Sequence, residues 1–326
     1  MAGKRESKVS LVVGSAGQDG HYLAELLCAR GDHVIGISRQ RLISSRTGAR
    51  PAIDIFDRTQ VHACIAEFKP HEIYYLCAYH GAAESSTPDP LLTYQRCHET
   101  HVAGWLNFLD GVDTLGLGCR LFYAASSHVF GIPESSPQNE RTALAPVCLY
   151  GITKTAGVGL CRHYRNSRGV WCAAGILYNH ESPRRPLPFV SRKIVAAAVD
   201  IKRGAKRTLA LGNLSAEVDW SAAQDCVAAM AGILQLEEPA DFVIASGVLH
   251  TVRDFVAAAF ARLDLRWEPY VVEDRALLRA VERPVPLCGD ATRLRDSTGW
   301  RPEIGFTDMV GRMVAAELSS KENSVK

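Results

Sequence analysis

Tyr150 and Lys154 are the side chains of this sequence whose types and spacing best suit proton and hydride chemistry. They stand four residues apart at the start of a segment with helical periodicity, so they share one face of a helix. A phenol with a pKa of about 10 is a poor base at neutral pH unless a cation stabilises its phenolate, and lysine supplies such a cation. We therefore predict that this pair moves a proton while a hydride passes to or from a bound cofactor.

A short polar run upstream can join the same site. Ser126, Ser127 and His128 follow an apolar segment that we expect to be a strand. Hydroxyl groups at the end of that strand would face the same cleft and hydrogen-bond the reacting oxygen. A tyrosine and a lysine at this spacing arise easily by chance, but their combination with the serine pair and an upstream glycine turn is specific.

The glycine turn consists of Gly14, Gly17 and Gly20, directly after the first expected strand and directly before a helix. Glycines at this spacing permit a tight turn and let the backbone approach a pyrophosphate, which N–H groups at the helix N-terminus bind. The alternative is a turn that only connects a strand to a helix. The position of the three glycines in the first strand–helix unit favours dinucleotide binding.

The type of dinucleotide follows from the end of the second expected strand. Arg39 and Arg41 lie there, without an acidic residue to accept the ribose hydroxyls of NAD. Arginine suits a 2′-phosphate, which favours NADP, and solvated loop charges are the alternative interpretation. Asp54, at the end of the third expected strand, is placed to reach the adenine.

The elements that position these residues follow from the alternation of β-branched runs with helix-period segments. The expected strands are 9–13, 33–37, 52–55, 73–77, 120–125 and 170–177. The expected helices are 21–30, 60–68, 91–109, 154–165, 189–202, 222–236 and 252–263. We predict an α/β Rossmann fold, a doubly wound parallel sheet, with residues 1–178 as the NADP(H)-binding domain. Residues 179–326 form a smaller, mainly helical substrate domain, from which segments near 205–250 can return to the sheet.

Composition excludes several other classes of protein. Lys and Arg number 37 against 35 for Asp and Glu, so the net charge of +2 gives no field that favours nucleic acid or an anionic membrane. We see no signal peptide and no stretch of membrane-spanning length, and we expect a cytoplasmic enzyme. The ten cysteines lack metal-site spacing, so we expect buried thiols and no metal.

Four groups of segments resemble the extended short-chain dehydrogenase/reductases, and within them the GDP-mannose 4,6-dehydratase family. They are 17–20 (GQDG) with 22–25 (YLAE), 178–185 (YNHESPRR) with 189–194 (FVSRKI), 211–214 (LGNL) with 219–220 (DW), and 241–245 (DFVIA) with 250–253 (HTVR). The resemblance covers nearly the whole chain, and the NHESPRR segment is distinctive of that branch.

The resemblance implies roles for individual residues. In the family, a tyrosine takes the sugar C4 hydroxyl proton while NADP+ accepts the C4 hydride. The implied catalytic residues are Ser126, His128, Tyr150 and Lys154. The implied cofactor-binding residues are Gly14, Gly17, Gln18, Asp19, Gly20, Arg39, Asp54, Ile55, Leu76, Ala78, Tyr150 and Lys154. The implied substrate-binding residues are Ser127, Asn179, Arg185, Lys193, Arg279 and Glu282.

Departures from the family pattern concern the elimination that comes after oxidation. His128 stands where the family has the glutamate that removes the C5 proton, so it is either an acid–base group or a packed spectator. Val218 replaces a diphosphate-binding arginine. The family's phosphate-binding role is assigned to Arg279 with Glu282, and 283–284 (RP) is the alternative.

The surroundings of the sugar and of the cofactor also differ from the family pattern. Tyr79 and His80 would reshape the sugar pocket. The loop after Arg39 is shorter than the family loop that reaches a neighbouring subunit in a tetramer. We therefore expect a homodimer, with a tetramer as the alternative.

Three hypotheses result. The leading one is an NADP-dependent nucleotide-sugar dehydratase that acts on a GDP-linked sugar through a 4-keto intermediate. The second is a 4-ketoreductase or 4-epimerase, which needs Ser126, Tyr150 and Lys154 but no base for C5. The third is a non-catalytic NADP(H)-binding relative, which retention of that whole residue set disfavours. The sugar itself is not specified by any of these motifs.

Overall fold

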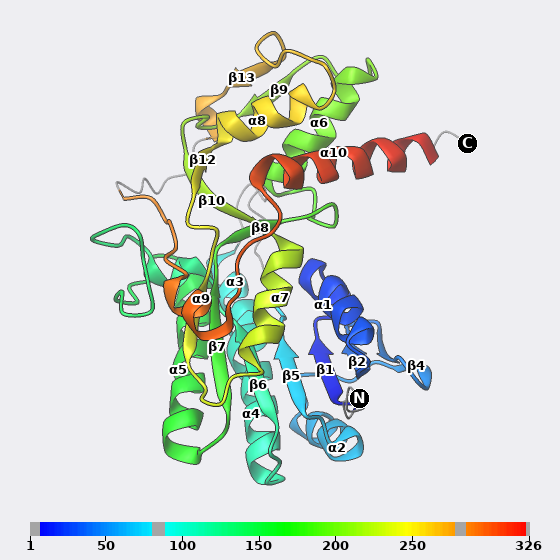
Figure 1. The fold of residues 1–326 in the computed structure, drawn as a ribbon, viewed down its shortest axis with the longest axis vertical. Helices are drawn as coiled ribbons and strands as arrows, with labels where there is room; N and C mark the ends of the chain where they lie inside the picture. Colours follow the sequence, from blue (N-terminus) through cyan, green and yellow to red (C-terminus); the bar gives the residue numbers. More distant parts are fainter. Residues whose placement is uncertain (1–6, 80–88, 278–284, 324–326) are drawn as a thin grey trace.

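A computed structural model describes residues 7–79, 89–277 and 285–323. Its largest element is an eight-stranded sheet in the order β11-β7-β6-β5-β1-β2-β3-β4 (Figure 1). The strands in chain order are β1 (Val9–Val13), β2 (His33–Ile37), β3 (Arg41–Ser44), β4 (Gly48–Pro51), β5 (Glu72–Tyr75), β6 (Arg120–Ala124), β7 (Cys172–Leu177) and β11 (Asp241–Ile244). From β11 to β2 all neighbours are parallel, and the strand order reverses between β1 and β5. The predicted doubly wound parallel sheet is confirmed, and its ligand site is expected beyond the carboxyl ends at this reversal.

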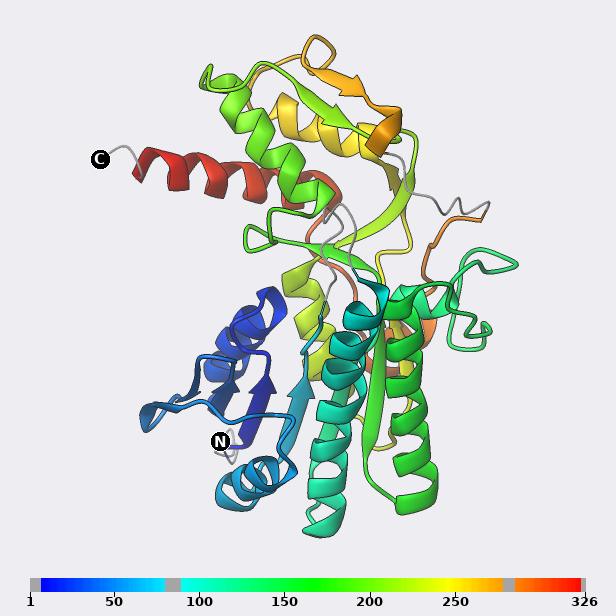
Figure 2. The same cartoon turned by 180° about the vertical axis from the view of Figure 1, so that it is seen from behind.

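Helices cover both faces of this sheet (Figures 1 and 2). One face is covered by α1 (Gln18–Ala29), α7 (Ala223–Ile233) and α9 (Thr292–Thr298), and the other by α2 (Arg58–Phe68), α4 (Gly104–Thr114) and α5 (Leu149–Arg168). Because both faces are covered, the central strands are almost continuously apolar and buried. The expected helix 91–109 is divided into α3 (Pro90–His98), a π-helical turn η1 (Glu99–Ala103) and α4.

A smaller unit lies above the carboxyl ends of the strands (Figure 2). Its helices are α6 (Val190–Lys202), α8 (Val252–Ala261) and α10 (Phe306–Asn323). Its strands are β8 (Asn179–Glu181), β10 (Glu217–Ala222) and β12 (Leu249–Thr251) in one sheet, and β9 (Leu209–Leu211) with β13 (Val271–Glu273) in another. These elements enclose an apolar cluster of their own, in which Trp220 packs against Phe255 and Phe306.

The prediction of a strand at 52–55 is wrong. A hairpin of β3 and β4 extends the sheet antiparallel to β2, and the chain then leaves the sheet. Asp54 lies in the turn that leads into α2, where its Oδ1 accepts the N–H of Phe56 at 2.9 Å and its N–H donates to Gln60 Oε1 at 3.0 Å. These local hydrogen bonds compete with strand pairing, which apolar residues alone did not reveal.

The second half of the chain contributes to both units. β11 pairs with β7 at the edge of the large sheet, and α7 packs on α1.

Within the described part of the chain, no helix has the length and apolar character that crossing a bilayer requires.

Candidate active site

The glycine turn lies between the carboxyl end of β1 and the start of α1. Gly14 has a φ of +96°, which a residue with a side chain rarely adopts. A Cβ on Gly20 would lie 2.3 Å from the carbonyl oxygen of Gly14, so a larger residue would push the helix from the strand. Gly17 is the N-cap of α1 and has no side chain to cap it. The first-turn N–H groups of α1 are therefore oriented to bind a phosphate.

Lys154 is buried beneath the carboxyl ends of β5 and β6. Its Nζ donates hydrogen bonds to the carbonyl oxygens of Ala124 at 2.7 Å and Cys77 at 3.4 Å. It also lies 5.0 Å from the ring centre of Tyr123 and 5.8 Å from that of Tyr150. Burial lowers the pKa of Lys154 to about 7, because neutral carbonyls and distant thiols only partly replace water around the ammonium group.

Tyr150 lies at the start of α5, within a group of polar side chains. Burial raises the pKa of Tyr150, while the charge of Arg185 and a side-chain hydrogen bond with Ser126 act in the opposite direction. The imidazole rings of His101 and His128 stand nearly perpendicular to the phenol ring, at 86° and 82°, with ring centres 5.1 Å and 5.7 Å away. The structure thus brings Ser126, His128, Tyr150 and Lys154 together.

His128 is held by the turn that follows β6. It belongs to the short 3-10 helix η2 (Ser127–Phe130), and its N–H donates to Ser126 Oγ at 3.3 Å. Its Nδ1 lies 3.6 Å from Sγ of Cys148, the residue that caps α5. His128 is therefore fixed beside Tyr150 from two elements, whereas the neighbouring Ser127 is buried in the protein.

An ion pair connects the glycine turn to β8. His180 Nε2 lies 2.9 Å from Asp19 Oδ2, and Gln18 Nε2 donates to the His180 carbonyl at 3.1 Å. Burial alone would raise the pKa of Asp19, but the His180 charge outweighs it and the pKa falls. For His180 the directions are reversed: burial alone would lower its pKa, but the charge of Asp19 raises it. Gln18 and Asp19 were predicted only as cofactor-binding residues. In the structure their side chains also fix the segment that leads to the smaller unit.

Arg185 reaches toward the same centre from the smaller unit. Its guanidinium lies 3.6 Å over the ring of Phe189, and its Nε is 3.2 Å from Glu181 Oε2. Glu181 is buried and also accepts the hydroxyl of Ser191 at 2.6 Å. Burial raises the pKa of Glu181, and Arg185 opposes that rise. Phe189 and Glu181 thus both contact the guanidinium of Arg185.

The remaining predicted substrate residues are placed differently. Asn179 is exposed at the start of β8, and Lys193 lies half-buried in the first turn of α6. Arg279 and Glu282 lie outside the described residues, as does His80. Asp219, from the segment that resembles the family, is buried.

The buried carboxylate of Asp219 binds the protein itself. It accepts the backbone N–H groups of Ser246, Gly247 and Gly289 at 3.0–3.1 Å. These hydrogen bonds join β10 to two loops beside the smaller unit. The structure therefore gives Asp219 a role in holding these segments together.

The other predicted cofactor residues lie after β2, after β5 and in the turn before α2. Arg39 is exposed at the end of β2, yet near enough to Cys77 that its charge opposes the rise in the pKa of that thiol caused by burial. Leu76 continues the β5 pairing through its N–H, which donates to the Val13 carbonyl at 2.9 Å, and Ala78 lies just beyond. The carbonyl of Ile55 accepts the side chain of α4 residue Asn107 at 3.0 Å.

Sequence reasoning missed the contacts of two histidines, that of His180 with Asp19 and that of His101 with Tyr150. His180 belongs to the NHESPRR segment, so its position in a distinctive motif was an available signal. His101 lies in a segment expected to be an ordinary helix, and only its polar character on a buried helix face could have indicated it.

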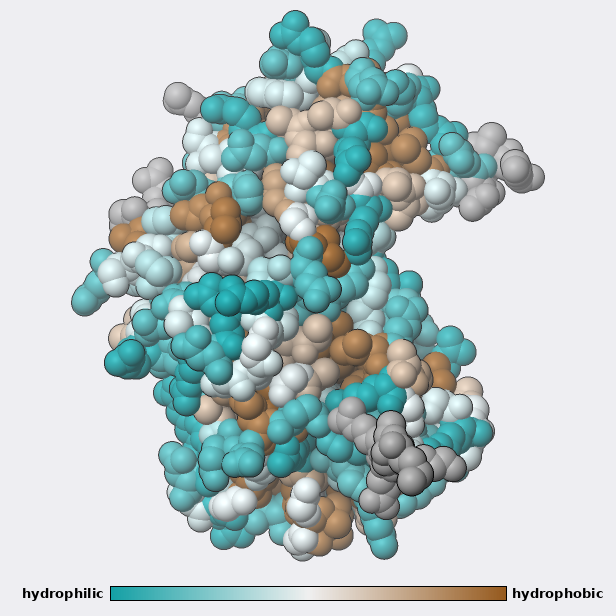
Figure 3. Space-filling model, viewed as in Figure 1, coloured by the Kyte–Doolittle hydropathy of each residue, from teal (hydrophilic) through white to brown (hydrophobic). Residues whose placement is uncertain are grey.

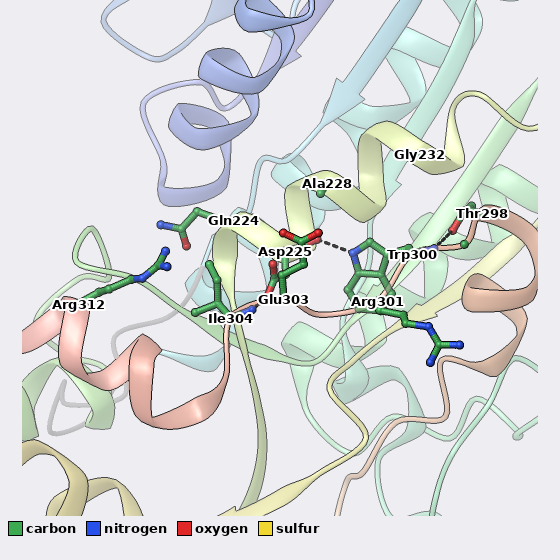
Figure 4. A pocket seen from close by; sticks show the side chains of 11 residues that line it. Gln224, Asp225, Ala228, Gly232, Thr298, Trp300, Arg301, Glu303, Ile304 and Arg312 are labelled. Atoms are coloured by element: carbon green, nitrogen blue, oxygen red, sulfur yellow. Dashed lines mark hydrogen bonds between the residues drawn. The ribbon is translucent and has the colours of Figure 1, made fainter.

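A cavity of about 510 Å³ lies elsewhere, on the outer side of α7 (Figure 4). Its polar walls include Asp225, which accepts backbone N–H groups from the chain leading into α10. Arg301 and Arg312 lie on opposite sides of this cavity and do not converge on one point (Figure 4). None of the residues that line it belongs to the Tyr150 centre.

Among the described residues, the thiols are not paired and the potential metal ligands are not clustered. All ten cysteines are free thiols. Over residues 7–79, 89–277 and 285–323, no group of three or more His, Cys, Asp or Glu side chains is arranged to hold a metal ion.

The doubly wound sheet, the glycine turn and the Ser–Tyr–Lys arrangement define the class of extended short-chain dehydrogenase/reductases. The comparison with protein families narrows this class. The chain belongs to the GDP-mannose 4,6 dehydratase family, whose model matches residues 11–313.

Similar sequences carry the same family description. The chain is 33% identical to the GDP-mannose 4,6-dehydratase of Sinorhizobium fredii, over 96% of this chain and 97% of that protein. It is 34% identical to the GDP-mannose 4,6 dehydratase of Homo sapiens, over 95% and 91%.

Solved structures confirm the fold. RMD from Pseudomonas aeruginosa, solved with NADPH, matches with a TM-score of 0.82 and 21% identity, over 96% of this chain and all of that one (100%). A UDP-glucose 4-epimerase from Thermus thermophilus, solved with NAD, matches with a TM-score of 0.77 and 23% identity, over 95% and 98%.

Proposed function

We propose that this protein is an NADP-dependent nucleotide-sugar 4,6-dehydratase that acts on a GDP-linked hexose, in the manner of GDP-mannose 4,6-dehydratase. The observation that carries the proposal is the arrangement of Tyr150, which is hydrogen-bonded to Ser126 and lies beside the buried ammonium of Lys154. Family membership supplies the nucleotide sugar as the class of substrate.

The residues present fit NADP. A Cβ on Gly14 would contact the Leu76–Cys77 backbone at 3.2 Å, and one on Gly20 would overlap the turn, so the glycines keep the turn closed below the N-terminus of α1. Gly14, Gly17 and Gly20 would face the pyrophosphate, and Arg39 the 2′-phosphate. When bound, the cofactor would supply hydride transfer: as NADP+ it would take up the C4 hydride of the sugar, and as NADPH it would give a hydride to C6.

The Tyr150 phenolate oxygen takes the proton of the sugar C4 hydroxyl and becomes the phenol, while Ser126 Oγ hydrogen-bonds the same sugar oxygen. The Lys154 charge stabilises the phenolate that accepts this proton. Arg185, in contact with Glu181 and Phe189, binds a phosphate oxygen pair of the nucleotide. The fold brings each of these groups to the carboxyl ends of the strands.

The elimination step falls to His128. With the carbonyl formed at C4, the C5–H bond is acidic, and the imidazole takes that proton. The electron pair forms the C5–C6 double bond as the C6–O bond breaks, and the same proton leaves with the oxygen as water. Because Nδ1 faces Cys148, we assign the transfer to Nε2. When a hydride is added at C6, the proton that Tyr150 took from the C4 hydroxyl is returned to C5, which restores the phenolate and gives the substrate minus water.

We propose that the remainder of the organisation follows these roles. Residues 1–178 mainly bind NADP(H), and 179–326 mainly bind the sugar nucleotide, with Asn179, Lys193, Arg279 and Glu282 among its ligands. Free thiols at all ten cysteines favour a reducing compartment, the cytoplasm.

Incubation with GDP-mannose and catalytic NADP+ tests the proposal. A 4-keto-6-deoxy product with the mass of substrate minus water supports it, and His128→Ala should then abolish this product. A 4-ketoreductase or 4-epimerase is favoured by one observation, the histidine at the position of the family's carboxylate. Lack of product, with NADPH consumption on a supplied 4-keto sugar, would establish that second function instead.

We also propose a homodimer formed through the helices on the α4–α5 face. Apolar side chains are exposed there on α3, α4 and α5, at Leu91, Leu92, Tyr94, Leu106 and Ile152. The face that Figure 3 presents, over α1 and α7, instead shows small apolar patches separated by polar ones. Light scattering after gel filtration should give twice the chain mass, and Leu106→Arg should give the monomer. A monomeric wild-type protein would overturn this assignment.

A further inference from the structure

His101 is a fully buried histidine beside Tyr150 that the mechanism above does not use. It lies in the π-helical turn η1, and its side chain is 0% exposed. Tyr123 contacts this turn, and its hydroxyl donates to the His101 carbonyl at 3.0 Å. A π-helical turn inside a helix aims a side chain differently from an α-helix, and such turns are frequent at functional sites.

The two ring nitrogens of His101 have defined partners. The backbone N–H of Tyr79 donates to Nε2 at 3.0 Å, so this nitrogen carries a lone pair. Nδ1 lies 2.8 Å from the hydroxyl of Thr153, and that hydroxyl donates to the carbonyls of Leu149 or Tyr150 at 3.1 Å and 3.0 Å. Since the hydroxyl hydrogen is used for a carbonyl, Nδ1–H must donate to Thr153. The hydrogen bonds thus fix one tautomer.

This network joins two segments that must stay in register for hydride transfer. Thr153 and Tyr150 belong to α5, whereas Tyr79 follows β5 and lies two residues after Cys77, whose carbonyl accepts Lys154 Nζ. The His101 ring also meets the Tyr150 ring edge to face, at 86° and 5.1 Å. One rigid side chain therefore contacts the proton acceptor and the strand end beside it.

We propose that His101 is a positioning residue, which as a neutral Nδ1–H imidazole fixes the Tyr150 phenol relative to the segment after β5. The inference rests on the proposed hydride transfer through Tyr150. It requires two separable hydrogen bonds, one to Tyr79 and one to Thr153. Misplacing a reacting group by about 1 Å can cost on the order of 100-fold in rate.

Matched variants separate the two hydrogen bonds. His101→Asn retains an amide near Thr153, His101→Gln retains one near Tyr79, and Thr153→Val removes the hydroxyl while keeping the side-chain volume. We expect His101→Ala to lower kcat about 30-fold, with KM for the nucleotide sugar within about twofold. His101→Asn, His101→Gln and Thr153→Val should each lower kcat less than His101→Ala. The limb of the kcat/KM pH profile that reports Tyr150 should shift in each variant.

Two readouts distinguish positioning from a merely structural role. The proposal would be overturned if soluble His101→Gln and Thr153→Val had lower melting temperatures but unchanged kcat and an unchanged Tyr150 limb of the pH profile. Imidazole ¹⁵N spectra of the wild-type protein should show His101 as the Nδ1–H tautomer, and an Nε2–H or charged ring would also overturn it. If GDP-mannose is not dehydrated, the proposed function fails by itself. The same variants are then compared in NADPH-dependent reduction of a 4-keto sugar, and the spectra test the network without any substrate.

Discussion

Two buried charged groups lie at opposite ends of the same parallel strands, and the protein surrounds them differently. Glu72, at the amino end of β5, is bound by charged and polar side chains. Its partners are Lys8 at 2.7 Å, Tyr74 at 2.8 Å, Gln235 at 2.9 Å and Arg30. Lys154, at the carboxyl ends of β5 and β6, has two carbonyl oxygens as its hydrogen-bond partners in the described structure, at 2.7 Å and 3.4 Å.

The pKa values report this difference. Burial would raise the pKa of Glu72, but hydrogen bonds from Lys8, Gln235 and Arg30 outweigh it and lower the value to about 2. Burial also dominates at Lys154, where too few partners offset it and the pKa falls to about 7. The charge of Glu72 at the amino end of the sheet therefore stabilises the fold. The charge of Lys154 at the carboxyl end is destabilised by burial but is required for the chemistry.

The largest expected effect is loss of activity at the carboxyl end. Tyr150→Phe removes the proton acceptor, so kcat should fall about 1000-fold, equivalent to about 4 kcal/mol of activation free energy. The free energy of unfolding should change by less than about 0.5 kcal/mol. Steady-state kinetics and urea unfolding measure both quantities. Tyr164→Phe, on the same helix, is the control, and equal losses of activity in the two variants would contradict the assignment.

The next effect is loss of stability at the amino end. Glu72→Gln leaves the surrounding charges without their carboxylate and should lower the free energy of unfolding by about 3 kcal/mol at pH 7. Because the folded pKa is about 2 against an ordinary 4.5, this contribution is present above pH 4.5 and is lost as pH falls toward 2.

Urea unfolding between pH 7 and pH 3 measures the effect of Glu72→Gln. Glu67→Gln, which removes an exposed partner of Arg50, is the control and should have little effect. A difference between wild type and Glu72→Gln that does not shrink with falling pH would show that packing, not charge, is responsible.

A smaller effect of opposite sign is expected at Lys154. Lys154→Met should abolish turnover yet raise the free energy of unfolding of the cofactor-free protein by about 2 kcal/mol at pH 6. The folded pKa is about 7 and the ordinary value is 10.5, so the wild-type penalty is complete below pH 7 and disappears as pH rises toward 10.5. Chemical unfolding at pH 6 and pH 9 checks the sign.

The exposed Lys202 provides the control for this change. Its Nζ donates to one carbonyl, that of Leu263, at 2.7 Å. Lys202→Met should give no gain in stability that depends on pH. If Lys154→Met destabilised the protein at both pH values, the ammonium group would be well compensated and the contrast between the two ends would fail.

The smallest effects come from one hydroxyl at each end. Tyr74→Phe removes a hydrogen bond to Glu72 and should cost about 1 kcal/mol of stability, with kcat unchanged. Ser126→Ala should lower kcat about fivefold to tenfold, or about 1 kcal/mol, with stability unchanged. Unfolding and kinetic measurements on both variants test the separation. A loss of activity in Tyr74→Phe would indicate that the two ends are coupled.

Much of this organisation could be predicted because its signals are local. The apolar strands, the GxxGxxG turn and the four-residue spacing of Tyr150 and Lys154 are each read within a few residues, and the structure places them as predicted. The hairpin of β3 and β4 could not be read in this way, because four-residue strands carry little periodicity. Asp54 was placed in a strand for the same reason.

Contacts between distant segments were beyond a sequence pattern. The His180–Asp19 ion pair joins residues 161 positions apart, and the His101–Thr153 hydrogen bond joins residues 52 apart. In neither contact are the two partners related by a fixed spacing in the sequence. The roles predicted for Arg279 and Glu282 stay predictions, since both lie outside the described residues.

The sequence by itself determined the class of cofactor turn, the order of the central elements and the identity of the Tyr–Lys pair, because short-range periodicity and side-chain chemistry decide these. Only the tertiary structure decided which charges are stabilised. Lys8, Arg30 and Lys154 are similar cations in the sequence, but two reach the Glu72 carboxylate and the third is enclosed with carbonyl oxygens. Burial and the partners that accompany it set the pKa, and folding alone brings those partners together.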